Sequence, residues 1–126
     1  MRVLLDTAVF IFAVEAPDRL SRRAAAVLKG PETVRELSSI SLTEIAVKSS
    51  LGKLSVSQAI ARQGIADLDV RILPFTAEHA FQLLALPAHH RDPFDRQIIA
   101  QALSEKVPVL TPDMQFGLYD GLKVMW

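Results

Sequence analysis

The chain has 126 residues, a length that predicts a single domain over residues 1–126. Its 14 lysine and arginine residues balance 14 aspartate and glutamate residues, so bulk charge gives no reason to expect nucleic-acid binding, which must come from local clusters. The absence of cysteine excludes disulfides and thiolate metal sites and fits the reducing cytoplasm. The first residues do not resemble a signal peptide, and no run approaches the ~20 apolar residues of a membrane span. We therefore expect a cytoplasmic protein without membrane contact.

Short strand-like runs alternate along the chain with longer helical patterns. The apolar run of Arg2–Asp6 predicts a buried strand, which leads into a short apolar helix that ends at Pro17. Ser21–Lys29 predicts a helix, and the Gly-Pro pair that follows is a typical stop. A second short strand is predicted at Glu36–Ser41.

Two helices are predicted in the middle of the chain from their capping residues. Ser41 and Glu44 have the spacing of a capping box, which predicts a helix that runs to Leu51. A further helix is predicted over Ser55–Asp67, with Ser55 and Gln58 as its capping box. Both N-termini are thus placed at a serine that precedes Glu or Gln by three residues.

The last third of the chain contains a long helix with a clear start. Asp92 as N-cap and Pro93 at the first helical position predict a helix that runs to Glu105. The other predicted elements are a strand at Val70–Leu73, a helix at Thr76–Leu86, a loop at Pro87–Arg91, a strand at Val107–Thr111 and an edge strand at Leu122–Trp126. This alternation predicts an α/β fold with a mostly parallel central sheet of four to five strands flanked by helices.

Four carboxylates stand where α/β proteins gather functional groups, beyond the carboxyl ends of the strands. Asp6 ends the first strand, and Asp113 follows the strand at Val107–Thr111. Glu44 and Asp95 each lie in the first turn of a predicted helix. Two charges 4 Å apart repel by about 4 kcal/mol at an effective dielectric of 20, so a converging cluster requires protonation or a cation. All-oxygen ligands select Mg²⁺ or Mn²⁺.

Three of these acids also have structural explanations, which stay open at this point. Glu44 completes the capping box with Ser41. Asp95 lies where a negative charge opposes the helix dipole, and Asp113 follows proline in a turn. Asp6 is hardest to explain in this way, because it lies between two apolar runs and so needs a partner.

Six segments carry a family resemblance: Leu4–Thr7, Ser41–Lys48, Gly52–Leu54, His90–Arg96, Ile98–Ala102 and Thr111–Asp113. They resemble the successive signatures of the PIN-domain family, and most closely the VapC-type toxins of bacterial type II toxin–antitoxin systems. The similarity extends from Leu4 to Trp126, and the Asp-Pro-Phe-Asp-Arg block is its most specific part. The sequence departs from residues common in the family at Ala8, Thr43 and Pro112. None of these differences removes an acid, so they concern the fit of the substrate more than catalysis.

The resemblance implies a parallel α/β fold and a Mg²⁺-dependent endoribonuclease, with Mn²⁺ as a substitute, that acts on RNA such as tRNA. It also implies a cognate VapB-type antitoxin and a homodimer. The family's catalytic acids fall on Asp6, Glu44, Asp95 and Asp113. We expect Asp6 and Asp95 to ligate the metal directly and the other two to act through water or a second ion. The alternative is a catalytically weak PIN-fold module that binds RNA or protein.

Four further residues are predicted to support this site. Thr111 and Ser41 are candidates for hydrogen bonds to the acids, although Ser41 fits a helix cap equally well. Asp92 fits the N-cap better than a place among the catalytic acids. Arg96, together with Arg91, is predicted to contact phosphate.

Two other features are expected to lie outside the chemistry. Lys48 follows Glu44 by one helical turn, so an intrahelical ion pair is its plain interpretation. The adjacent His89 and His90 suggest metal-free RNA cleavage by a histidine pair, but neighbouring side chains in a loop rarely converge. We therefore disfavour a histidine mechanism.

Overall fold

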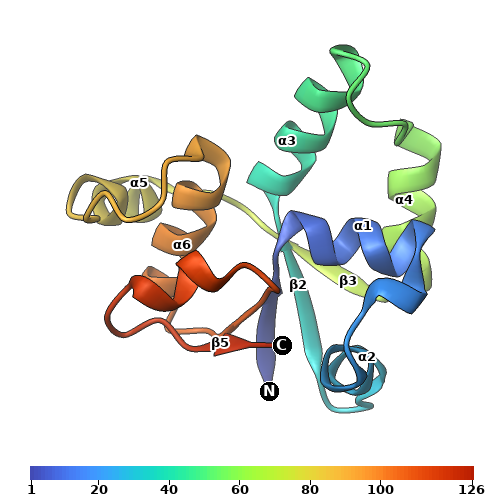
Figure 1. Ribbon diagram of the computed structural model, residues 1–126, viewed down its shortest axis with the longest axis horizontal. Helices are drawn as coiled ribbons and strands as arrows, with labels where there is room; N and C mark the ends of the chain where they lie inside the picture. Colours follow the sequence, from blue (N-terminus) through green and yellow to red (C-terminus); the bar gives the residue numbers. More distant parts are fainter.

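Five parallel strands form the central sheet in the computed structural model, which describes residues 1–126 (Figure 1). The strands are β1 (Arg2–Leu5), β2 (Val34–Ser38), β3 (Val70–Leu73), β4 (Val109–Leu110) and β5 (Val124–Met125), in the order β3-β2-β1-β4-β5. The helices are α1 (Thr7–Glu15), α2 (Arg22–Lys29), α3 (Ser39–Ser50), α4 (Gln58–Asp67), α5 (Ala77–Leu84) and α6 (Pro93–Glu105), with short 3₁₀ helices η1 (Pro17–Arg19) and η2 (Met114–Leu118). The predicted α/β fold with a parallel sheet is confirmed, and β5 is an edge strand as expected.

Alternate side chains of β1 enter two separate hydrophobic cores, one on each face of the sheet. Val3 and Leu5 belong to the core that α1, α2 and α4 cover, whereas Leu4 belongs to the core that α6 and η2 cover. All three side chains are fully buried, which explains why this strand is apolar without alternation. None of the helices has the length and apolar character needed to cross a bilayer.

The strand register aligns the C-terminal ends of β1, β2 and β4, which together form what we call the C-terminal edge of the sheet. Leu5 at the end of β1 pairs with Leu37 of β2 and with Leu110 of β4. The residues that follow these three positions therefore leave the sheet side by side. In Figure 1, α1 and α3 begin at this edge.

The start of α3 differs from the prediction. β2 ends at Ser38 and α3 begins at Ser39, so a strand that continues to Ser41 is wrong. The side chain of Ser38 is the N-cap and accepts a hydrogen bond from the amide of Ile40 at 3.0 Å. Ser41 lies inside the helix, so its predicted capping box with Glu44 is also wrong. Several serines in this run can cap a helix, and the register of β2 against β1 selects among them.

The start of α4 also lies further along the chain than predicted. Ser57 is the N-cap and accepts a hydrogen bond from the amide of Ile60 at 3.2 Å, so the capping box predicted at Ser55 and Gln58 is wrong. Val56 explains the shift, because it packs into the core before the helix begins. The observed β4 and β5 are two residues each, shorter than predicted.

A network of ion pairs fastens α5 and α6 to the sheet. Glu36 in β2 is fully buried and pairs with Arg2 at 2.6 Å and with Arg71 at 2.9 Å. Arg2 also contacts Glu105 at the end of α6 at 3.0 Å, and Glu105 contacts Nε2 of His79 in α5 at 2.9 Å. The hydrogen bond from His79, followed by that from Arg2, holds the pKa of Glu105 below its usual value.

Candidate active site

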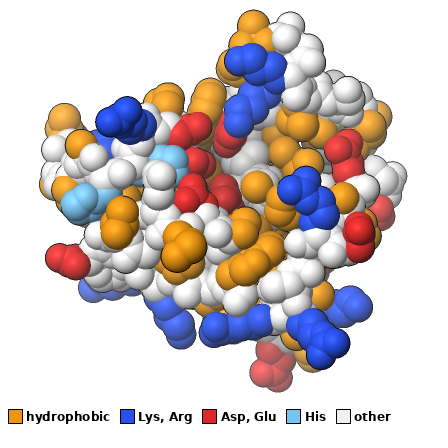
Figure 2. Space-filling model, viewed as in Figure 1, with side chains coloured by type: hydrophobic (Ala, Val, Ile, Leu, Met, Phe, Trp, Pro, Cys, Tyr) orange, Lys and Arg blue, Asp and Glu red, His pale blue; other side chains and the backbone are white.

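The four predicted acids lie at the edge of the sheet where β1, β2 and β4 end. Asp6 connects β1 to α1, Glu44 lies in α3, and Asp95 lies in the first turn of α6. Asp113 follows β4 and is the N-cap of η2. Figure 2 shows acidic side chains gathered in a hollow near the middle of this face, beside a histidine and below a basic side chain.

Asp6 is held in a buried and weakly paired position. Asp6 is only 6% exposed, and its Oδ2 accepts a hydrogen bond from Oγ1 of Thr111 at 2.7 Å, which gives Thr111 the carboxylate contact predicted for it. Burial, together with the charge of Glu44, raises the pKa of Asp6 to about 6 against the opposing effect of the Thr111 hydroxyl. No cationic side chain contacts this carboxylate.

Glu44 has one paired and one unpaired oxygen. Nζ of Lys48 contacts Oε2 at 2.6 Å, which confirms the predicted intrahelical ion pair. Oε1 is buried and has no hydrogen-bond partner. An unpartnered carboxylate oxygen in a buried position is costly, so its burial indicates a partner that is not a protein group.

Asp95 is electrostatically linked to the other acids. Burial, followed by the charges of Asp6, Asp92 and Glu44, raises its pKa to about 7 against the opposing effect of His90. A carboxyl with this pKa is partly protonated at neutral pH. The convergence predicted from widely separated segments is therefore visible in the mutual repulsion of Asp95, Asp6 and Glu44.

His90 joins two of the acids and was missed as a site residue in the sequence. Its Nε2 lies 2.8 Å from Oδ2 of Asp113 and 3.2 Å from Oδ2 of Asp95. Ligand atoms of these three residues all lie within 4.8 Å of one another, a grouping that could hold a metal ion. The signal in the sequence was the position of His90 just before the Asp-Pro helix start, but only the fold of residues 87–91 decides where the ring points.

The remaining predicted support residues have mainly structural contacts. Oδ1 of Asp92 accepts hydrogen bonds from the amides of Phe94 and Asp95 at 2.8 and 3.1 Å, which confirms it as the N-cap of α6. The hydroxyl of Ser41 accepts a hydrogen bond from Oγ1 of Thr7 at 2.8 Å and contacts no carboxylate. Its predicted hydrogen bond to an acid is absent.

Arg96 braces the loop that carries His90. Its guanidinium donates hydrogen bonds to the carbonyl oxygens of Pro87 at 3.0 Å and of Leu86 and His90 at 3.4 Å. These contacts stabilise the loop beside the acids. The predicted contact of Arg96 with phosphate stays a prediction.

Comparison with known proteins places this architecture in a family. The family described as PIN domain matches residues 3–122. The chain belongs to the PIN-domain family. No curated protein sequence matches this PIN domain.

Several solved toxin–antitoxin structures share the fold of this PIN domain at low sequence identity. VapBC2 from Rickettsia felis, bound to a promoter DNA fragment, is 20% identical with a TM-score of 0.72, and the alignment covers 99% of this chain and 98% of that one. DNA-bound VapBC from Salmonella typhimurium is 18% identical with a TM-score of 0.68, over 99% and 97%. VapBC-5 from Mycobacterium tuberculosis is 23% identical with a TM-score of 0.61, over 98% and 97%.

The donor groups of this PIN domain fit a hard divalent cation. The site offers carboxylate oxygens from Asp6, Glu44 and Asp95, and Lys48 is the only lysine or arginine that forms an ion pair with any of them. The unpartnered Oε1 of Glu44 supplies an oxygen that a cation would satisfy. Magnesium and manganese prefer such oxygen ligands.

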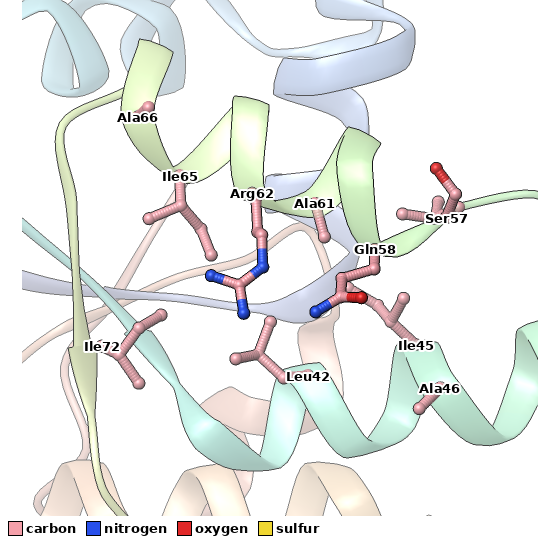
Figure 3. Close-up of a pocket in the computed structure, with 11 residues that line it drawn as sticks. Leu42, Ile45, Ala46, Ser57, Gln58, Ala61, Arg62, Ile65, Ala66 and Ile72 are labelled. Atoms are coloured by element: carbon pink, nitrogen blue, oxygen red, sulfur yellow. The ribbon is translucent and has the colours of Figure 1, made fainter.

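An apolar groove of about 540 Å³ lies between α3 and α4 of the PIN domain. Figure 3 shows Leu42, Ile45 and Ala46 of α3 opposite Ala61 and Arg62 of α4. Eight of the eleven residues that line the groove are hydrophobic, so it is an apolar surface next to a charged site. The acids and the groove use different sides of α3.

Proposed function

We propose that this PIN domain is a Mg²⁺-dependent endoribonuclease and the toxin component of a toxin–antitoxin pair. The observation that carries the proposal is the set of buried and half-buried acids at the C-terminal edge of the sheet, with the pKa of Asp6 near 6 and of Asp95 near 7. Functional sites are where such pKa shifts cluster. The likeness to VapBC structures supports the toxin role.

In this proposal Asp6 and Asp95 hold the cation, and Glu44 and Asp113 support it from the other sides of the hollow. When bound, Mg²⁺ supplies positive charge to the phosphate oxygens and lowers the pKa of the water that attacks phosphorus. Thr111 keeps Asp6 oriented through its hydroxyl, at 2.7 Å. Hydrolysis then yields a 5′-phosphate and a 3′-hydroxyl. Mn²⁺ is expected to replace Mg²⁺, because it takes the same ligands.

The substrate is RNA, with tRNA as one candidate, and it is bound through local positive charge. Arg91 is exposed and precedes the N-cap of α6, so it can reach a phosphate near the acids. Lys48 is 42% exposed beside Glu44 and offers a second contact. Because such contacts release counterions, RNA affinity should fall as salt concentration rises. An affinity independent of salt would contradict this electrostatic mode of binding.

The decisive test is RNA cleavage by the purified protein with Mg²⁺ and with EDTA. We expect cleavage of tRNA with Mg²⁺ or Mn²⁺, none with EDTA, and none with Asp6→Asn. Asp18→Asn is the matched control, because Asp18 is an acid in η1 outside the site, and it should cleave like the wild type. Binding of RNA without cleavage at any metal concentration would instead favour the weak PIN-fold binding module.

The proposed partners are a VapB-type antitoxin and a second copy of the chain. The apolar groove between α3 and α4 supplies a surface for an antitoxin segment with apolar side chains. Ala46 is exposed and lines the groove, so Ala46→Glu should weaken the complex without unfolding the protein. Co-expression with the antitoxin and light scattering after gel filtration measure both assemblies. Full complex formation by Ala46→Glu would contradict the groove as the docking site.

A further inference from the structure

The imidazole of His90 is buried between two carboxylates of the candidate site. His90 is 8% exposed. Its Nε2 lies 2.8 Å from Oδ2 of Asp113 and 3.2 Å from Oδ2 of Asp95. Two explanations fit these distances: Nε2 is a metal ligand like the carboxylates around it, or it carries a hydrogen that it donates to Asp113.

The other ring nitrogen decides between these explanations. Nδ1 of His90 accepts a hydrogen bond from the backbone amide of Asp92 at 3.1 Å. A nitrogen that accepts from N–H has its lone pair occupied and carries no hydrogen, so the neutral ring has its hydrogen on Nε2. A metal-ligating histidine instead uses a lone pair for the metal and donates from its other nitrogen. His90 has the opposite arrangement.

We propose that His90 is a positioning residue that donates its Nε2–H to Asp113 and lies against Asp95, and that it is not a metal ligand. The hydrogen bond holds Oδ2 of Asp113 on the ring, and the 3.2 Å contact with the same nitrogen limits the positions that Oδ2 of Asp95 can take. A cation at this site is then held by carboxylate oxygens alone, which selects hard cations over zinc. This consequence rests on the proposed nuclease function, whereas the position of the hydrogen does not.

The surroundings of His90 hold the ring in this one orientation. The backbone amide of His90 donates to the hydroxyl of Tyr119 at 2.8 Å. The ring of Phe116 packs edge-on against the imidazole, with 5.7 Å between the centroids. Both aromatic residues are buried in the core beneath α6. With Nδ1 bound to the Asp92 amide, the ring cannot flip without losing hydrogen bonds at both nitrogens.

The same device occurs a second time in the chain, away from the site. Nδ1 of His79 accepts from the amide of Thr76 at 2.9 Å, and Nε2 lies 2.9 Å from Oε2 of Glu105. His79 therefore carries its hydrogen on Nε2 for the same reason, in a place that has only structural contacts. It provides an internal reference for a buried histidine locked in this tautomer. The exposed His89, whose ring packs edge-on against Tyr119 but forms no hydrogen bond, provides the reference with a free tautomer.

Long-range ¹H–¹⁵N correlation spectra of histidine-labelled protein test the position of the hydrogen directly. Without metal, we expect His90 and His79 to give the pattern of the Nε2–H tautomer and His89 to give an averaged pattern. Assignments come from the loss of signals in His90→Gln and His89→Gln. We expect His90 to keep its Nε2–H pattern when Mg²⁺ is added. An Nδ1–H pattern, before or after metal, would overturn the proposal.

Variants test what the hydrogen bond does. His90→Ala should weaken Mn²⁺ binding, measured by calorimetry, by about 10- to 100-fold, as is typical for groups that orient metal ligands. His90→Gln should recover most of this loss, because its amide offers an N–H donor at the end of a side chain of similar reach. His89→Gln is the matched control and should bind like the wild type. Equal weakening by His90→Gln and His90→Ala would count against a donor role.

These experiments separate the role of His90 from the proposed function. If the wild type binds Mn²⁺ but cleaves no RNA, the nuclease proposal fails. The tautomer of His90 and the Mn²⁺ affinities of its variants then still test the positioning role. If the wild type cleaves RNA and His90 shows the Nδ1–H tautomer, the nuclease proposal stands and the positioning role fails.

Discussion

Two groups of buried acids lie on the same sheet and are treated in opposite ways. Glu36, in the middle of β2, has no exposed surface and pairs with Arg2 and Arg71. Asp6, one residue beyond the end of β1, is nearly as buried. Its carboxylate accepts a hydrogen bond from the hydroxyl of Thr111 but contacts no cationic side chain. The protein neutralises Glu36 with its own arginines, whereas Asp6 has no such partner and its charge can be neutralised by a bound cation.

The difference shows how a structural acid can be told from a functional one. A buried charge is tolerated when its own chain supplies the opposite charge, as for Glu36. At the C-terminal edge the pKa values rise instead, to about 6 for Asp6 and about 7 for Asp95, because burial and like charges outweigh the effects of Thr111 and His90. Burial alone therefore does not indicate function, whereas burial of a carboxylate without a lysine or arginine partner does.

The largest expected effect separates the two groups by activity. Asp6→Asn should lower kcat for RNA cleavage by more than about 100-fold, because several kcal/mol of metal-supplied stabilisation depend on the charge that is removed. The variant should remain folded, since an amide oxygen can still accept from Thr111. Gel-based cleavage assays and circular dichroism check both statements. Glu36→Gln is the control, and its folded fraction should keep the kcat of the wild type. A comparable loss of kcat in Glu36→Gln would contradict the distinction between structural and functional acids.

Stability should show the reverse pattern. Glu36→Ala should lower the free energy of unfolding by about 2–4 kcal/mol, because it leaves Arg2 and Arg71 without their shared partner. Asp6→Asn should leave this free energy unchanged or raise it, since a repulsive buried charge is lost. Urea unfolding followed by fluorescence of the single Trp126 measures both. If Glu36→Ala unfolds no more easily than the wild type, the network does not fasten the helices to the sheet.

Metal and pH should act together on the unpaired acids. Folding raises the pKa of Asp6 and Asp95 above the ordinary value of 3.8, so the metal-free folded state binds more protons than the unfolded state up to about pH 7. Its stability should therefore fall as pH rises from 5 to 8. The lowered pKa of Glu105 acts in the other direction, but only in more acidic solution.

Magnesium should reverse this loss, because it binds the ionised carboxylates. At a hundredfold excess over Kd it should add about 2.7 kcal/mol near pH 8, and less near pH 5, where protons compete. Urea unfolding at four pH values, with and without Mg²⁺, measures the coupling. Asp6→Asn should flatten both trends. A metal-free protein that becomes more stable between pH 5 and 8 would show that the acids are compensated.

The smallest effect tests whether Asp92 belongs with the structural acids. Asp92→Ala should lower the free energy of unfolding by about 1 kcal/mol, since the amides of Phe94 and Asp95 lose their acceptor. Asp92→Asn keeps an oxygen at the cap, so it should keep both stability and cleavage. Loss of cleavage by Asp92→Asn in a folded protein would instead move Asp92 into the active site.

Local rules predicted the elements better than their boundaries. The apolar strand predicted at Arg2–Asp6 lies at Arg2–Leu5, and α6 begins at the Asp-Pro pair as expected, because both features follow from short-range chemistry. The N-caps of α3 and α4 were placed at the wrong serines, because several serines stand nearby. Packing chose between them: the pairing of β2 with β1 ends the strand at Ser38, and burial of Val56 delays α4.

The sequence by itself determined the α/β fold and the acids at the strand ends, because hydrophobic periodicity and position along a strand are local properties. Only the tertiary structure decided which acids stay unpaired. Glu36 meets Arg71 and Asp6 meets Thr111 across long stretches of chain. The tertiary structure also decided the role of His90, because a ring nitrogen becomes donor or acceptor only when the fold brings its partners into contact.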